Sequence, residues 1–507
     1  MPTTAVLGGG LSGLCSAYFL SRALPASHRI VVLEKSKRFG GWIETIHREQ
    51  DDITFETGPR SIRPVGLAGL LTLQVINDLG LSKSLVTVPK SHPAAKNRFI
   101  YYPDRLTKAP SSLPSAIKAV LTPSSPFYGL LPHVLKEPFL SPPCTSEREK
   151  LNNGYNDESV DSFVSRRLGP QLASNVLSAL VHGIYAGDTR QLSMRAVFPS
   201  LWNLEAKHGS IIKGMLARKA KTPSEEEIQK EQVAKSIPEI AEMMKDVSVY
   251  SLQGGLEALP KAMIRHLQSL PNVEMRAECG ISELDFSSNG NEGFKVKTDT
   301  DSFTAENVIS ALGSSTLAHL IPDLPHLSYN PSVTVGVVNL AFPADFSLPV
   351  KGFGYLIPRT VSSEHNPHQV LGVVFDSDML GGQTRLTVMM GGHYWNNKTI
   401  ASQEDLPRQA LETLRLHGLV PQDIEPVASR AQIQKDCIPQ YAVGHVQRMT
   451  ELHQQLKDKY KGRLGVVGSS YSGVGINDCV LGSWRQARTL IDTGASTGLE
   501  HYTVNAQ

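Results

Sequence analysis

The stretch AVLGGGLSGLCSAYFL, residues 5–20, decides the fold. Its first three residues are apolar, as in a buried parallel strand, and the apolar residues after Gly13 recur at helical spacing. Between them stands the pattern Gly8-x-Gly10-x-x-Gly13. The first glycine permits a tight turn, the second lets the backbone approach a pyrophosphate, and the third lets helix and strand pack closely. The stretch therefore predicts a strand, a glycine turn and a helix that bind a dinucleotide.

The next segment supports this interpretation. The β-branched run 30–33 predicts a second strand, and Glu34 follows it directly, 21 residues after Gly13. An acidic residue at that place can accept hydrogen bonds from both hydroxyl groups of a ribose. The alternative is a chance glycine cluster beside a surface glutamate. The joint occurrence of strand, turn, helix, strand and acid disfavours it.

Other glycine-rich segments are compatible with the same ligand. Arg38-x-Gly40-Gly41-Trp42 suits a second backbone approach to phosphate with Arg38 as the counter-charge, although Trp42 could equally be a core aromatic residue. Residues 58–61, Gly-Pro-Arg-Ser, follow a strand-like segment, but Gly-Pro is also common in plain turns. Near the other end, residues 468–479 read GSSYSGVGINDC before an apolar helix. Alone, that loop indicates only a helix start.

The composition limits the class of protein. The chain has 507 residues, too many for one ordinary core, and its 40% hydrophobic and 19% charged residues can bury a large core. Lys plus Arg number 50 against 48 for Asp plus Glu, which argues against a nucleic-acid-binding protein. Five cysteines without a CxxC pair argue against a disulfide framework and against a metal site. No apolar run is long enough to cross a membrane, and the N-terminus predicts no cleaved presequence.

Longer segments carry a family resemblance. The chain resembles the flavin amine oxidase superfamily, whose FAD site combines an N-terminal βαβ unit with a C-terminal glycine loop. Within it, the chain is similar over nearly its whole length to the members that oxidise porphyrinogens in haem synthesis. The segments are VLGGGLSGLCSAYFLSR, FGGWIETI, FETGPRSIRP, HPAAKNRFIY, VHGIYAGDTRQLSMRAVFPSL, SLQGGLEALPKAM, VKGFGYLIP, LGVVFDS, DCIPQYAVGH and GSSYSGVGINDCV.

The resemblance implies an α/β fold that is α+β in the substrate domain. It has a Rossmann-like FAD-binding domain of the amine-oxidase type, a substrate domain with a mixed sheet, and a helical membrane-binding domain. The expected division places FAD-binding parts at 1–88, 249–325 and 431–507, substrate-domain parts at 89–110 and 326–430, the helical domain at 111–215, and a charged insertion at 216–248.

The resemblance also implies one non-covalent FAD. The pyrophosphate would lie at the first glycine turn, the ribose at the end of the second strand, the flavin at the later motifs, and the adenine at a strand backbone of V-x-x-I type. The corresponding residues are Gly8, Gly9, Gly10, Leu11, Ser12 and Gly13, then Glu34 and Lys35, then Trp42, Gly58, Pro59, Arg60, Ser61, Ser469, Val474, Gly475 and Ile476, and finally Ile281.

The implied substrates are protoporphyrinogen IX and O2. Arg98 would pair with a propionate, and the backbone of Gly183 would lie near the pyrrole N–H groups. The walls against the rings would be Phe353, Leu356, Val374 and Met389. Judged without the resemblance, these four read as core residues and Arg98 as a surface arginine. The flavin would take hydride from the bridging carbons, and O2 would reoxidise it to give hydrogen peroxide. No residue pattern identifies a catalytic base.

The Pro- and Ser-rich but apolar segment 110–143 matches the membrane-binding part of the family, which lies in one leaflet without crossing it. The alternative is a helical lid over the pocket. The resemblance further implies a peripheral place on the mitochondrial inner membrane, a homodimer, and transfer of the product to a ferrochelatase.

Three alternatives remain at this point. The chain could act on another substrate with the same scaffold, as a coproporphyrinogen oxidase, an amine oxidase or a carotene desaturase. It could be a flavin-free binding protein like the Rab-escort and GDP-dissociation-inhibitor proteins, although its intact glycine motifs disfavour that. It could also be a structural α/β protein without a cofactor.

Overall fold

Strand β1 (Thr3–Leu7) is buried along its whole length and lies at the centre of a parallel sheet. The order is β19-β13-β1-β2-β9, formed with β19 (Leu464–Val466), β13 (Asn307–Ser310), β2 (Arg29–Leu33) and β9 (Val273–Arg276). Helix α1 (Leu11–Ala23) follows the glycine turn, so the predicted strand, turn, helix and strand are confirmed. Because every strand runs the same way, their carboxyl ends meet at one edge.

The computed structural model describes residues 1–50, 52–217, 223–287 and 293–504. Its chain contacts divide it into two units, each assembled from separate stretches of sequence. Unit 1 comprises 1–87, 223–331 and 447–507, and unit 2 comprises 88–222 and 332–446. The α/β class with a mixed second sheet is therefore confirmed, whereas the finer sequence-based division stays a prediction.

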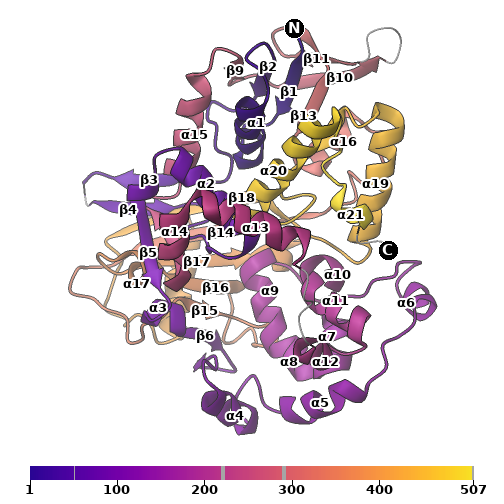
Figure 1. Ribbon diagram of the computed structural model, residues 1–507. Coiled ribbons are helices and arrows are strands. Elements are labelled where there is room, and N and C mark those ends of the chain that lie inside the picture. Colours follow the sequence, from indigo (N-terminus) through magenta and orange to yellow (C-terminus); the bar gives the residue numbers. More distant parts are fainter. Residues whose placement is uncertain (51, 218–222, 288–292, 505–507) are drawn as a thin grey trace. The chain divides into compact units, whose positions relative to one another are not determined.

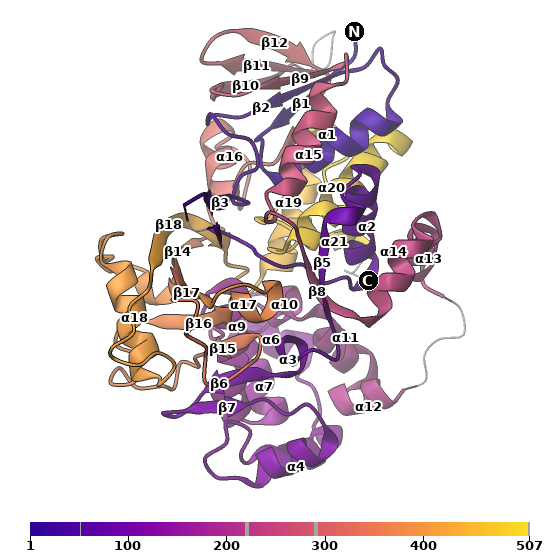
Figure 2. The same ribbon diagram turned by 90° about the vertical axis from the view of Figure 1, so that its left-hand side faces the viewer.

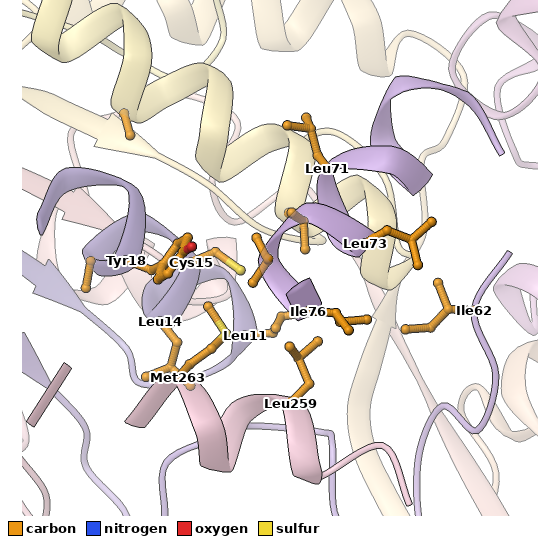
Figure 3. Close-up of a cluster of buried hydrophobic side chains, with 14 of the residues drawn as sticks. Leu11, Leu14, Cys15, Tyr18, Ile62, Leu71, Leu73, Ile76, Leu259 and Met263 are labelled. Carbon is orange, nitrogen blue, oxygen red and sulfur yellow. The ribbon is translucent and has the colours of Figure 1, made fainter. Parts of the chain in front are cut away.

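Helices cover one side of the parallel sheet in unit 1. Helix α1 packs between α15 (Ala258–Gln268), α2 (Gly66–Asp78) and α20 (Ile476–Thr493). Apolar side chains from three of these helices point toward one another (Figure 3). Burying each such side chain stabilises the fold by about 1.5–3 kcal/mol. The labelled members from α1, α2 and α15 are Leu11, Leu14, Cys15, Tyr18, Leu71, Leu73, Ile76, Leu259 and Met263.

A second cluster lies on the other side of this sheet. It joins the antiparallel strands β10 (Ile281–Ser287), β11 (Gly293–Thr298) and β12 (Ser302–Ala305) to α16 (Ser314–Leu320) and α19 (His445–Tyr460). Figure 2 shows β10, β11 and β12 next to β9, β2 and β1. The other elements within unit 1 are β3 (Thr45–Arg48), β4 (Ile53–Glu56), η1 (Ser82–Ser84), α13 (Glu225–Ser236), α14 (Pro238–Met243), η4 (Met244–Asp246), β8 (Val247–Leu252) and α21 (His501–Val504).

The charged segment contains Ser224-x-x-Glu227, a capping-box pattern that predicts the start of a surface helix. The structure confirms this helix. The Ser224 hydroxyl accepts a hydrogen bond from the Glu227 amide at 3.2 Å, and the Glu227 carboxylate accepts one from the Ser224 amide at 2.8 Å. Helix α13 begins directly after Ser224 and packs against α2. Residues 218–222 of the predicted insertion lie outside the described part of the chain.

Unit 2 contains a sheet in the order β18-β14-β17-β16-β15-β6-β7. One face packs against α18 (Leu406–Leu416) and forms the main core of this unit. Its strands are β18 (Ala428–Pro439), β14 (Ser332–Ala341), β17 (Arg385–Gly391), β16 (Val370–Phe375), β15 (Gly354–Leu356), β6 (Arg98–Tyr101) and β7 (Leu106–Lys108). The short elements α3 (Pro93–Lys96), α17 (Asp376–Leu380) and η5 (Gly392–Trp395) also occur in unit 2. Strand β5 (Leu85–Pro89) begins in unit 1 and ends in unit 2.

The remainder of unit 2 is helical (purple and magenta in Figure 1). None of the described helices is long and apolar enough to cross a membrane. The helices are α4 (Leu113–Leu121), α5 (Leu130–Lys136), η2 (Glu137–Phe139), α6 (Thr145–Leu151), α7 (Val160–Leu168), α8 (Pro170–Leu172), the π turn η3 (Ala173–Leu177), α9 (Ser178–Tyr185), α10 (Met194–Val197), α11 (Pro199–His208) and α12 (Ile211–Leu216).

Candidate functional site

In the first glycine motif, the helix and the turn before it pack at a distance that only glycine permits. A Cβ on Gly13 would lie 1.9 Å from the carbonyl oxygen of Gly8, so the helix can approach the turn only without a side chain there. The Gly8 amide donates to the Leu33 carbonyl at 2.8 Å, which ties the turn to β2. Gly10 has open space by comparison, because its Cβ would meet Gly41 only at 3.7 Å.

The carboxylate at the end of β2 is fixed beside this turn. The Glu34 carboxylate accepts hydrogen bonds from the amides of Gly9 and Ser36, each at 2.8 Å. The Ser36 hydroxyl also donates to it at 2.8 Å. The neighbouring Lys35 is exposed. Glu34 therefore stands half-buried where a ribose hydroxyl could replace one of its present donors.

The second glycine motif packs directly on the first. The Gly40 amide donates to the Gly9 carbonyl at 2.8 Å, and Gly41, at φ +60°, would bring a Cβ to 3.0 Å from the Gly10 Cα. The Arg38 guanidinium donates to the Ile43 carbonyl at 3.0 Å and to the Gly41 carbonyl at 2.6 Å. In these contacts Arg38 holds the turn together, whereas its predicted role as a phosphate counter-charge stays a prediction.

Trp42 and the 58–61 segment lie beside each other. Trp42 is 47% exposed, so the alternative that it is a core aromatic is wrong. A Cβ on Gly58 would lie 2.2 Å from the Trp42 carbonyl oxygen, and Arg60 donates back to the Gly58 carbonyl at 3.2 Å. Pro59 and Ser61 are half-buried on either side of the buried Arg60.

The C-terminal glycine loop reaches the same edge of the sheet. Gly468, which follows β19, would place a Cβ 3.3 Å from the Ser12 hydroxyl oxygen. Ser483 of α20 donates to the Ser12 carbonyl at 2.9 Å. The loop then ends at Gly475, whose amide donates to Asp478 in the first turn of α20 at 3.1 Å. Burial raises the pKa of the Asp478 carboxyl. Ser469, Val474 and Ile476 are all half-buried in or next to this loop.

Sequence reasoning missed part of this edge. The backbone bonded to Glu34 belongs to residues 276–279: the Glu34 amide donates to Arg276, and the Cys279 amide donates to Glu34, both at 2.9 Å. Ile281 lies two residues further on in β10 and pairs with Thr298 of β11. Cys279 is thus a second candidate for a backbone contact to a base beside the ribose, and the contact at Ile281 stays a prediction.

These residues fit FAD. The carboxyl edge of the parallel sheet brings together two glycine turns with space for a pyrophosphate at Gly10, a carboxylate for a ribose, and a glycine loop leading into a helix. When FAD is bound, residues 8–13 and 40–41 would hold its phosphates, Glu34 its ribose, and the 58–61 and 469–476 segments its flavin part.

The predicted substrate residues gather within unit 2. Arg98 pairs with Gly354, which pairs with Val374 on its other side. Leu356 pairs with Gly372, which pairs with Met389. Paired residues of adjacent strands point to the same side of a sheet. These four predicted residues therefore lie on one face, which we call the open face of the sheet, whereas Tyr355 and its neighbours pack on α18 from the other side.

Two contacts define the open face further. The Arg98 guanidinium lies 4.8 Å from the centre of the Phe353 ring. Leu356 lies between two glycines, since a Cβ on either Gly183 of α9 or Gly372 of β16 would come within 2.7 Å of its side chain. Phe353, Leu356 and Val374 are not members of the α18 core. Met389 packs against Val337 in a smaller cluster, which favours a core role for it.

A histidine pair lies beside this face, at α9. Nδ1 of His182 is 2.7 Å from the Ile357 carbonyl oxygen, and its Nε2 is 3.0 Å from Nε2 of His393. His182 is 2% exposed. Burial, followed by the neighbouring His393, lowers the pKa of His182 to about 4, so it is neutral at neutral pH. Sequence reasoning noted the backbone of the neighbouring Gly183 but did not identify this pair.

The comparisons with known proteins give the class first. The family described as "Flavin containing amine oxidoreductase" matches residues 11–491. A provisionally described protoporphyrinogen oxidase from Exiguobacterium sp. 255-15 superposes with a TM-score of 0.72 at 24% identity, covering 97% of this chain and 98% of its own. The cyclohexylamine oxidase of Brevibacterium oxydans IH-35A gives a TM-score of 0.62 at 13% identity, covering 97% and 99%. These two structures show the fold alone.

Sequence relatives narrow the class. The protoporphyrinogen oxidase of Homo sapiens is 37% identical over 97% of this chain and 98% of its own length. That of Schizosaccharomyces pombe is 34% identical over 96% and 98%. The chain therefore belongs to the flavin-containing amine oxidoreductases, and within them to the protoporphyrinogen oxidase family. The resemblance and the FAD cofactor are confirmed, and the alternatives without flavin are not favoured.

Proposed function

We propose that the protein oxidises protoporphyrinogen IX to protoporphyrin IX with O2 and releases hydrogen peroxide. The observation that carries the proposal is the similarity to relatives named protoporphyrinogen oxidase, 34–37% identical over almost the full length of both chains. When bound, FAD accepts hydride from the substrate and passes the electrons to O2.

The residues of the chain supply binding and orientation. On the open face, an aliphatic and aromatic surface around Phe353, Leu356 and Val374 suits a flat apolar macrocycle. Arg98 stands at its edge as the cation for a propionate, with Phe353 beneath its guanidinium at 4.8 Å. The exposed backbone of Gly183 borders Leu356 and could accept hydrogen bonds from pyrrole N–H groups. No side chain is assigned as the catalytic base.

The proposed function involves a lipid surface, because an apolar macrocycle would enter the site from the lipid. The helical part of unit 2 exposes large apolar side chains, among them Leu113 at 76% and Phe139 at 85%. Exposed apolar residues at intervals of four along α4 make one continuous stripe. This supports docking into one leaflet. The exposed set comprises Leu113, Ile117, Leu121, Tyr128, Leu131, Leu135, Phe139, Leu140, Leu151, Leu180, Ile184, Met215 and Leu216.

The proposed site of action is the mitochondrial inner membrane, where the protein would be peripheral. It would work as a homodimer and deliver its product to a ferrochelatase. All of these statements rest on the family resemblance.

The experiment is an aerobic assay of the purified, yellow holoenzyme with two substrates in parallel. Protoporphyrinogen IX should give porphyrin fluorescence together with O2 consumption and peroxide. Coproporphyrinogen should react at least about tenfold more slowly by kcat/KM, because the open face supplies one identified cation for its additional propionates. A preference for coproporphyrinogen, or no reaction with either substrate, would overturn the proposal.

A further inference from the structure

Helix α9 and the turns before it are tied to the segment after β15 by a row of side-chain hydrogen bonds. The Asn175 side chain accepts from the Thr360 hydroxyl at 2.9 Å, and the Ser178 hydroxyl accepts from the Arg359 amide at 3.2 Å. His182 completes the row at the Ile357 carbonyl. The spacing of three and four residues places all three side chains on one side of the helix.

The hydrogen bond at Ile357 fixes the proton positions in the pair. A carbonyl oxygen only accepts, so Nδ1 of His182 carries the proton and donates it. Nε2 of neutral His182 is then an acceptor, and Nε2 of His393 must donate to it across the 3.0 Å contact. The His393 amide in turn donates to the Ala186 carbonyl at 2.8 Å, at the end of α9.

His182 thus joins three elements that carry the open face. It lies on α9 beside Gly183, it holds the carbonyl of the residue after Leu356, and through His393 it reaches the 3-10 turn after β17. The Ile357 amide is already bonded to the Leu371 carbonyl of β16 at 3.0 Å. Both polar groups of the Ile357 backbone are therefore fixed, and with them the orientation of Leu356 between its two glycines.

We propose that His182, oriented by His393, is a positioning residue for the porphyrinogen site, which holds Leu356 against Gly183 and so sets the affinity for the macrocycle. This inference rests on the proposed function. His182 is buried, and its ring faces His393 rather than the open face. It therefore acts on substrate binding through the position of Leu356 and does not touch the substrate.

The charged groups around the pair are compatible with a neutral, fixed unit. His393 faces Asp188, Arg190, Arg359 and Lys398, and desolvation is the largest cause that lowers its pKa. The Tyr394 ring lies 5.4 Å from that of His182. Two neutral imidazoles therefore give the donor and acceptor pattern that the geometry requires near neutral pH.

The test measures kcat and KM for protoporphyrinogen IX with the FAD-loaded protein and four variants. His182→Leu removes both hydrogen bonds and His393→Leu removes the donor to His182. Each should raise KM about tenfold with kcat within about twofold and the flavin spectrum unchanged. His182→Asn keeps a donor in the place of Nδ1, and His393→Gln keeps one in the place of Nε2. Both should restore most of the affinity.

His417→Leu is the matched control. His417 is a buried histidine that contacts β15, the strand of Leu356, from the face opposite the open face. Its Nδ1 accepts a hydrogen bond from the Tyr355 hydroxyl at 2.7 Å. This control should lower thermal stability and leave KM unchanged. If the wild-type protein oxidises the porphyrinogen but the leucine variants keep its KM, or if His417→Leu raises KM equally, the positioning role is wrong. If the wild-type protein does not oxidise the porphyrinogen, the proposed function fails and this inference with it.

Discussion

Gly10 and Gly13 belong to one motif, but the structure gives them different tasks. A side chain at Gly13 would collide with the backbone of Gly8 at 1.9 Å, whereas one at Gly10 would meet its nearest protein atom at an ordinary 3.7 Å. The Gly13 requirement comes from folding, and we propose that the Gly10 requirement comes from the bound pyrophosphate.

Gly10→Ala should therefore yield a folded protein that has lost its flavin. We expect FAD affinity to fall by at least about a hundredfold, because the new methyl occupies the space of the approaching pyrophosphate. The measurement is flavin absorbance per mole of purified protein, with circular dichroism as the check on folding. Gly13→Ala should lower both the flavin content and the thermal stability. Full flavin content in Gly10→Ala would contradict the assigned phosphate position.

His417 predicts how stability depends on pH. Its Nε2 donates to the His365 carbonyl at 2.8 Å and its Nδ1 accepts from Tyr355, which requires the neutral ring. Burial lowers the pKa of His417 to about 4 from a usual value of 6.5. The unfolded chain thus binds more protons between these values, and stability falls as pH falls through that window.

The loss from His417 alone should approach about 2 kcal/mol at pH about 5. Urea denaturation of the wild-type protein and of His417→Gln, at pH about 7 and about 5, measures it. The variant should be less stable at the higher pH and should show a smaller decrease on acidification. Equal decreases in both proteins would show that His417 is not the group that titrates.

Among the elements, the helical part of unit 2 depends on one buried ion-pair group. The Arg167 side chain is fully buried and contacts the carboxylates of Glu205 and, at 3.3 Å, Glu137. Glu137 in turn accepts from the amides of Ile211 and Ile212, at 2.8 and 3.2 Å, and so caps α12. One arginine thereby links η2, α7, α11 and α12.

Arg167→Ala should lower the free energy of unfolding by about 3–5 kcal/mol, because it leaves the buried Glu137 without its cation. It also removes one of the arginines that contact Glu205, which keeps Arg148 and Arg166. Lys235→Ala, which removes an exposed pair with Glu231 at 2.8 Å, should cost less than about 1 kcal/mol. Thermal unfolding of the two variants side by side makes the comparison. Similar shifts would show that the buried group contributes no more than a surface pair.

At the same scale, periodicity predicted most elements but not their irregularities. The helical spacing of Val160, Phe163 and Val164 predicts a helix, which α7 confirms, and the capping pattern at Ser224 predicts the start of α13. The π turn at 173–177, which precedes the helix carrying His182, had no sequence signal. Asn175 and Ser178 bond there to Thr360 and Arg359, and such tertiary contacts are not encoded in local periodicity.

At the scale of the whole molecule, the family resemblance implied that both ends of the chain build one FAD site. The parallel sheet places β1 and β19 on either side of β13, which brings both ends to the same edge. Local pattern could not predict that the Cys279 backbone bonds to Glu34, because that depends on register between distant strands. It also could not predict the His182–His393 contact, which joins residues 211 positions apart.

The exposed apolar stripe predicts how the molecule meets a membrane. Replacing Leu113, Ile117 and Leu121 by Asn should reduce binding to lipid vesicles at least about tenfold, because each side chain would gain up to about 1.5–3 kcal/mol on leaving water. Vesicle cosedimentation measures it, and solution activity with detergent-dispersed substrate should be retained. The matched control replaces Ile228 and Met243, exposed apolar residues of unit 1, in the same way. Equal losses in both variants would contradict docking through α4.

The central claim is that the chain binds FAD for the oxidation of a porphyrinogen, and the anaerobic half-reaction tests it most directly. Protoporphyrinogen IX is mixed with the purified flavoprotein without O2 while the flavin absorbance is followed. We predict that the oxidised flavin band bleaches and returns, with porphyrin fluorescence, when air is admitted. A flavin band that stays unchanged in the presence of the porphyrinogen would contradict the account.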